Sequence, residues 1–273
     1  MAQPHLTYKI HNSDFADPLR HVQTDATPEQ IQHLVEEGYL VRERLIQGEL
    51  LEELRAAADE IAEQHGAEER AATNQSRRFG GLFVRNLLDH HPTFLKMLDY
   101  APTLGLARAV LGPQVQVHAF VLRVTYPGQE KQETHWHFHQ RVVPEPLPPF
   151  FARPHVIDNL IYLDDLTDAN GPLCVVPRSH LPLHTELPGD DYADKPDQVI
   201  VRVPAGSCIT SDAGIWHRGM PHTAAGTTRR LLILGYSPTW MKPIDRFGGA
   251  FTANLIADGD TETKELLGAT GWF

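Results

Sequence analysis

The sequence contains few cysteines and no long apolar run. Only Cys174 and Cys208 occur among 273 residues, too few for a disulfide framework and without the close cysteine pairs of a zinc ribbon. We expect both to be buried apolar residues with free thiols. No segment approaches the roughly 20 consecutive apolar residues of a transmembrane helix, and the start of the chain lacks a basic region followed by an apolar core. We therefore expect a cytoplasmic protein without a membrane partner.

Basic residues are also scarce relative to acidic ones. The 24 Lys and Arg residues face 35 Asp and Glu residues, which leaves a formal net charge of -11. Such a charge disfavours a nucleic-acid backbone or an anionic membrane surface as the main partner, and it favours a small molecule. With 41% hydrophobic and 22% charged residues, the composition is that of a soluble globular protein. We predict one domain over residues 1–273.

The first part of this domain, residues 1–112, is predicted to be mostly helical. Thr27-Pro28-Glu29-Gln30 supplies an N-cap, a proline at the first helical position and a glutamine that completes a capping box, which predicts a helix to about Glu37. Apolar residues at helical spacing predict a core-facing helix from Leu50 to Ala62. Pro92 and Pro102 are expected to open two further helices.

The second part, residues 113–243, is predicted to be a β core, followed by a C-terminal extension at 244–273. A long strand is expected from Val115 to Tyr126, where β-branched and aromatic residues predominate. The proline-rich segment from Pro144 to Pro154 is incompatible with a central strand and is expected to form a surface loop over the site, a candidate lid. Short strands separated by turn residues indicate an antiparallel barrel or jelly roll with helices packed on one face, a mainly β fold with added helices. These strands are expected at 156–163, 173–176, 199–203, 207–210, 215–217 and 231–236.

A cluster of histidines follows the long strand. His135, His137 and His139 alternate along the chain, and alternate side chains of an extended strand leave the same face, so two imidazoles can point at one metal ion. His217, far downstream, is the candidate third ligand. Three ligands on one side of a metal leave positions open for substrate and oxygen, as in non-haem iron oxygenases, although the usual set has one carboxylate where this chain has His139.

Several motifs, taken in order, resemble one known family, the phytanoyl-CoA dioxygenase family of iron(II)- and 2-oxoglutarate-dependent oxygenases. The resemblance runs from about Glu36 to Pro243. It implies a double-stranded β-helix, a cupin-like jelly roll, with added helices, and the activity of a non-haem iron dioxygenase. The segments that carry it are Trp136–His139, Ile161–Leu166, Asn170–Leu173, Val176–His180, Trp216-His217 and Arg229-Arg230.

The resemblance also implies roles for individual residues. His137 matches the first iron ligand of the family and His217 the last, while Arg229 matches the arginine that holds the far carboxylate of 2-oxoglutarate. A guanidinium suits that task because its planar fork binds a carboxylate through two hydrogen bonds. Arg230 is the alternative, since strand neighbours face opposite sides. Position also places three residues near the cofactor, Thr125, Trp136 and Gly219, although Trp136 has an equally good interpretation as a packing residue.

His139 departs from the family pattern, which has aspartate at this position. Either His139 coordinates iron, so that the metal ligands are His137, His139 and His217, or the metal site is impaired. We rank four acids below His139 as substitute ligands: Asp158, Asp164, Asp165 and Asp212.

The main hypothesis is therefore an oxygenase that uses Fe(II), 2-oxoglutarate and O2 to oxidise a small-molecule substrate. One alternative is a three-histidine oxygenase that does not use 2-oxoglutarate, against which Arg229 argues. The other is a catalytically silent relative that binds a ligand inside the barrel. Consumption of 2-oxoglutarate distinguishes the three hypotheses.

Overall fold

The computed structural model describes residues 5–9, 19–65, 80–139, 155–181 and 189–270. The proline-rich segment that we expected to form a lid, Pro144 to Pro154, lies outside these described residues. Among the described residues, no helix has the length and apolar character needed to cross a lipid bilayer.

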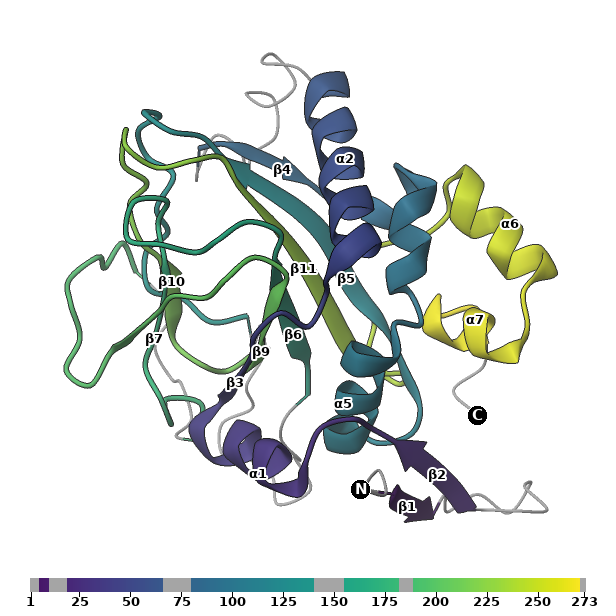
Figure 1. Cartoon of the computed structure of the whole chain (residues 1–273). Coiled ribbons are helices and arrows are strands. Elements are labelled where there is room, and N and C mark those ends of the chain that lie inside the picture. The colour runs from purple at the N-terminus through teal and green to yellow at the C-terminus, as the bar shows by residue number, and fades with distance from the viewer. Residues whose placement is uncertain (1–4, 10–18, 66–79, 140–154, 182–188, 271–273) are drawn as a thin grey trace.

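Six antiparallel strands form the large sheet at the centre of the molecule (Figure 1). The long strand expected from Val115 to Tyr126 is present almost unchanged as β5, and it pairs with β11 along its whole length. The sheet joins strands from both parts of the chain. Its two edge strands, β3 and β4, come from residues 1–112, and the four strands between them come from residues 113–243. In spatial order the strands are β3 (Tyr39–Arg42), β9 (Ser207–Asp212), β6 (Ile157–Tyr162), β11 (Arg229–Pro238), β5 (Val115–Thr125) and β4 (Leu82–Val84).

A smaller sheet lies opposite the large one. It contains β10 (His217–Gly219), β7 (Leu173–Val175) and β8 (Val199–Val201), in that order. Apolar side chains fill part of the space between the sheets, among them Tyr162 from the large sheet and Val175 from the small one. The prediction of a mainly β fold with added helices is confirmed. The position of one strand was wrong, because β10 begins at His217, where the expected strand ended.

Helices cover the outer face of the large sheet (Figure 1). Helix α2 (Gly48–Gln64) buries its predicted stripe, including Leu54 and Ile61, in the main hydrophobic core. Helix α1 (Pro28–Glu37) begins with the predicted capping box of Thr27 and Gln30, and α5 (Ala101–Leu111) begins beside Pro102. The segment after Pro92 is a 3-10 helix, η2 (Pro92–Met97), preceded by η1 (Leu87–Asp89).

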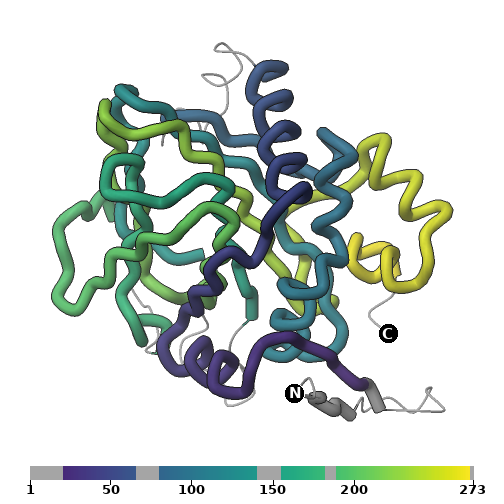
Figure 2. Tube along the Cα trace, viewed as in Figure 1, coloured from purple at the N-terminus to yellow at the C-terminus, as the bar shows by residue number. Residues whose placement is uncertain are grey.

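Both ends of the chain contain elements that the sequence patterns did not indicate. A hairpin of β1 (His5–Lys9) and β2 (Leu19–Gln23) precedes α1. The C-terminal extension forms α6 (Ala250–Asp258) and α7 (Thr261–Leu266), which lie beside the helical layer, on the side of the molecule away from the small sheet (Figure 2). The two cysteines are free and buried, as expected.

Candidate metal centre

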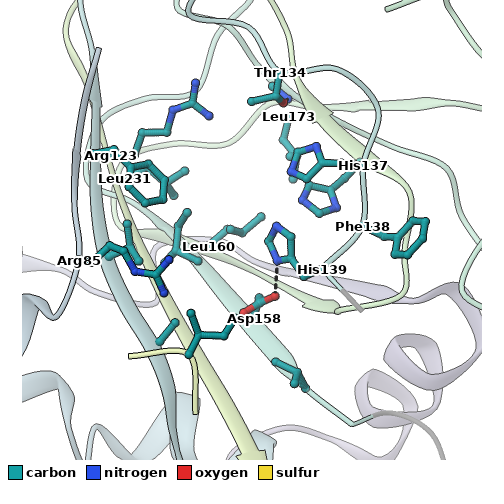
Figure 3. Close-up of a pocket in the computed structure, with 18 of the residues that line it drawn as sticks. Arg85, Arg123, Thr134, His137, Phe138, His139, Asp158, Leu160, Leu173 and Leu231 are labelled. Carbon is teal, nitrogen blue, oxygen red and sulfur yellow. Dashed lines mark hydrogen bonds and ion pairs between the residues drawn. The ribbon is translucent and has the colours of Figure 1, made fainter. Parts of the chain in front are cut away.

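A cavity of about 570 Å³ opens between the two sheets. One wall consists of inward-facing side chains of β5, β6 and β11, and the opposite wall carries His137 and His139 (Figure 3). His217 also lines the cavity and pairs with His137. Alternation along the strands produces this division, because side chains at every second position of a strand leave the same face. The same three strands direct their other side chains into the helical core.

Backbone hydrogen bonds bring the three histidines together. The N–H of His137 donates to the carbonyl of His217 at 3.0 Å, and the N–H of His217 donates back to the carbonyl of His137 at 2.9 Å. The N–H of His139 donates to the carbonyl of Ala213 at 2.7 Å, which continues this pairing. As a result, one potential ligand atom from each imidazole lies within 4.8 Å of the others.

Hydrogen bonds at Nδ1 orient the three imidazole rings. The Nδ1 atom of His137 lies 2.8 Å from the carbonyl oxygen of His135, and that of His217 lies 3.0 Å from the carbonyl oxygen of Ile215. The Nδ1 atom of His139 lies 2.6 Å from Oδ2 of Asp158 (Figure 3). Because these oxygens accept hydrogen bonds, each Nδ1 donates its proton to them, and in the neutral tautomer it is Nε2 that can bind a metal.

Burial also keeps two of the imidazoles unprotonated. Burial, together with the neighbouring histidines, lowers the pKa of His137 well below its ordinary value. Burial lowers the pKa of His217 to about 3, and His139 contributes to this shift. Both rings are therefore neutral near pH 7, as metal ligands must be.

Of the four acids considered as substitute ligands, Asp158 alone lines the cavity. It contacts His139 and is not part of the cluster of potential ligand atoms. The other three acids accept hydrogen bonds from backbone groups at turns and strand ends. Their donors are the N–H groups of Arg230 for Asp164, Ala205 for Asp165 and Gly214 for Asp212.

Arg229 and Arg230 begin strand β11 and point in opposite directions. Arg229 is 3% exposed, lines the cavity and donates from Nη1 to the carbonyl of Gly171. Its Nε has no hydrogen-bond partner among the described residues. Arg230 lies on the helical face, where it donates to Asp59 of α2 at 2.7 Å and to Asp164 at 2.8 Å. The guanidinium available to a ligand in the cavity is thus that of Arg229.

Two residues expected near the cofactor are not among those that line the cavity. Trp136 is fully buried, and its indole N–H donates to the carbonyl of Ala193 at 2.7 Å. The Cζ atom of Arg218 lies over its ring, 5.0 Å from the centroid. These contacts agree with the packing interpretation of Trp136, whose side chain leaves the opposite face from that of His137. Thr125 is buried opposite Arg229, and its hydroxyl has no described hydrogen-bond partner. Gly219 does line the cavity.

Arg123 also lines the cavity, and the sequence patterns did not single it out. The side chain of Arg123 lies on the wall opposite His137 and His139 (Figure 3), and its guanidinium donates to the carbonyl of Gln132 at 2.6 Å. Burial and the charge of Arg229 lower the pKa of Arg123 to about 9. Arg123 lies two residues before Thr125 in the long strand, so alternation places the two side chains on the same face of the strand. This spacing was the sequence signal for Arg123.

Comparison with known proteins identifies the family. The profile of the family described as phytanoyl-CoA dioxygenase (PhyH) matches residues 34–231. The protein named Dioxygenase af480, from Aspergillus fumigatus, is 25% identical over 173 residues, which are 63% of this chain and 53% of that protein. The protein named Ectoine dioxygenase, from Nocardia farcinica, is 26% identical over 213 residues, which are 71% of this chain and 68% of that protein. The chain thus spans only about half the length of the first of these relatives.

Solved structures show the same fold. The crystal structure of HygX from Streptomyces hygroscopicus, with nickel and 2-oxoglutarate bound, matches with a TM-score of 0.64 at 15% identity, over 82% of this chain and 92% of that chain. The predicted jelly roll with added helices is confirmed. The resemblance to the phytanoyl-CoA dioxygenase family that the sequence motifs indicated is confirmed. Because the profile covers well over half of its length, the chain belongs to the phytanoyl-CoA dioxygenase (PhyH) family.

Proposed function

We propose that this protein is an Fe(II)- and 2-oxoglutarate-dependent oxygenase that oxidises a small molecule at a three-histidine metal site. One observation carries this proposal: three imidazoles with their Nδ1 protons engaged converge beside a cavity that contains a buried arginine. The hydrogen bonds at Nδ1 specify the tautomers of the histidines, and the arginine gives the cavity a positive charge.

The residues present fit a divalent metal ion. Three neutral imidazoles on one side leave the remaining positions for other ligands, and iron bound there would supply the activation of oxygen. With His139 in place of a carboxylate, the three direct ligands add no negative charge to the +2 of the metal. A dianionic cosubstrate would offset the charge of the metal and its direct ligands, so 2-oxoglutarate remains a suitable partner.

The arginines fit the cosubstrate. Arg229 would hold one carboxylate of 2-oxoglutarate through its planar fork, in a part of the cavity closed to water. Arg123 adds a second positive charge on the same wall, which favours a dianion further. The rest of the wall includes Phe83, Val121 and Ile233, apolar side chains that would exclude water and contact the body of a small substrate.

A second candidate function is a metal-binding relative without turnover, which the replacement of the family's aspartate by His139 favours. Reconstitution of the metal-free protein with Fe(II) under anaerobic conditions separates the two. The wild type should bind stoichiometric iron and, after oxygen is admitted, consume 2-oxoglutarate and release an equal amount of succinate. Iron binding without any consumption of 2-oxoglutarate would reject the 2-oxoglutarate-dependent oxygenase.

The contribution of His139 is tested by His139→Ala, with His33→Ala, a substitution of an exposed histidine, as the matched control. We expect His139→Ala to lose iron and 2-oxoglutarate turnover, whereas the control keeps both. Metal analysis of protein as purified should also find copper, nickel or zinc in preference to iron, because an all-nitrogen site follows the general order of stability. If His139→Ala binds iron as the wild type does, His139 is not a ligand.

A further inference from the structure

One buried carboxylate beside the histidines has no role in the function proposed so far. Asp158 lies near the start of β6, is 4% exposed and lines the cavity. A buried ionised carboxylate costs several kcal/mol unless another group compensates its charge. Its described hydrogen-bond partner is Nδ1 of His139, at 2.6 Å (Figure 3).

The neighbouring strand leaves space for this carboxylate. Gly235 of β11 lies directly opposite Asp158 in the sheet, and a Cβ atom at that position would lie 2.6 Å from Oδ1 of Asp158. Gly235 is not among the residues with positive φ, so an L side chain is compatible with its backbone. The absent side chain therefore makes room for the carboxylate.

The three histidines differ in what holds their Nδ1 protons. His137 and His217 each use a neutral backbone carbonyl close in sequence. His139 uses the charged side chain of Asp158, which comes from the opposite wall of the cavity. A carboxylate behind a ligand imidazole fixes the orientation of the ring and increases its basicity, so it strengthens the bond of the other ring nitrogen to a metal.

We propose that Asp158 is the positioning residue of the metal site: it orients His139 and places next to the metal the negative charge that a directly bound aspartate supplies elsewhere in the family. This inference rests on the proposed function. In this arrangement the carboxylate lies behind a ligand and is not a ligand itself. The metal ion, its three ligands and this carboxylate together have a net charge of +1, as do a metal ion, two histidines and one directly bound aspartate. Asp158 is not itself one of the potential metal ligands and acts through His139.

The first test measures metal affinity without turnover. Zinc(II) is titrated into metal-free protein in competition with a chromophoric chelator, and thermal unfolding of the metal-free variants reports their stability. Asp158→Asn should weaken zinc binding by about 10- to 100-fold, since this is the usual effect of losing the group behind a ligand histidine. Asp164→Asn is the matched control, because Asp164 follows the same strand but binds Arg230 outside the cavity, and it should leave zinc affinity unchanged.

A double-mutant cycle separates positioning of His139 from a general effect of charge. In a His139→Asp background there is no ring to orient, so adding Asp158→Asn should reduce zinc affinity at most a few-fold. Gly235→Ala provides an independent variant that leaves every charge in place but displaces the carboxylate, and it should weaken zinc binding in the same direction as Asp158→Asn.

Each outcome decides a separate point. An equal loss from Asp158→Asn in the two backgrounds, or no loss in the wild-type background, would overturn the positioning role. A wild type that binds zinc with the predicted dependence on Asp158, but whose iron form consumes no 2-oxoglutarate, would reject the 2-oxoglutarate-dependent oxygenase and retain the positioning role. A wild type that binds no zinc would overturn both.

Discussion

At the scale of single residues, the pairing register of β11 places two adjacent arginines in different environments. Arg229 faces the cavity, where a carboxylate from solvent can satisfy its guanidinium. Arg230 faces α2, where Asp59 and Asp164 already satisfy it. A shift of the strand by one residue would exchange these environments, so the pairing of β11 with β5 and β6 decides which arginine meets a ligand.

The two arginines therefore allow a matched prediction for 2-oxoglutarate binding. Arg229→Ala should weaken the binding of 2-oxoglutarate to the metal-loaded, oxygen-free protein by about 2–5 kcal/mol, the usual loss when one partner of a buried charged pair is removed. Arg230→Ala should leave this affinity nearly unchanged. Isothermal titration calorimetry measures both, and similar losses for the two variants would contradict the assignment of Arg229.

At the scale of elements, a residue distant in sequence caps the start of α6. Asp89, at the end of η1, accepts hydrogen bonds from the N–H groups of Gly249 at 3.0 Å and Thr252 at 3.0 Å. It also accepts one from the hydroxyl of Thr252 at 2.7 Å. The first N–H groups of a helix have no partners inside the helix, so this carboxylate satisfies donors that α6 leaves open.

Loss of that cap should loosen the C-terminal extension. We expect Asp89→Ala to lower the free energy of unfolding by about 1–2 kcal/mol, as the loss of an N-cap does, and to accelerate amide hydrogen exchange within Ala250–Asp258. Asp258→Ala removes an exposed acid at the other end of the same helix and serves as the control. Unchanged exchange in Asp89→Ala would show that packing alone holds α6 in place.

At the scale of the whole molecule, the buried histidines link stability to pH. The pKa of His217 is lowered to about 3 and that of His137 well below its ordinary value, whereas an unfolded chain has values near ~6.5. Below that pH the unfolded chain binds protons that the folded chain does not bind. The free energy of unfolding of the metal-free protein should therefore fall as pH decreases from about 6.5 towards 3.

The size of this effect is measurable by urea denaturation of the metal-free protein. Between pH 6.5 and pH 5, each histidine kept neutral in the folded state should cost about 2 kcal/mol of stability. His217→Gln should show a shallower dependence on pH than the wild type, whereas His33→Gln, at an exposed position, should not. A wild type with the same stability at the two pH values would exclude burial of neutral imidazoles.

Several local elements could be predicted because their signals lie within a few residues of one another. The capping box at Thr27 and Gln30 marks the start of α1, and the β-branched run from Val115 marks β5. Other elements depend on distant partners. The hydrogen bonds from Gly249 and Thr252 to Asp89 are not visible in the local pattern of the extension, so α6 was not predicted. The expected helix after Pro92 proved to be a 3-10 helix.

The sequence by itself determined the motif order that identifies the family and the alternation that places His137 and His139 on one face, since alternation is a local property. Only the tertiary structure decided how these residues are supported. Asp158 meets His139 because β6 and the histidine segment form opposite walls of one cavity, and Gly235 leaves room because β11 lies next to β6. Such contacts arise from strand pairing and sheet packing. These bring together residues that are far apart in the sequence, so no periodic sequence pattern reveals them.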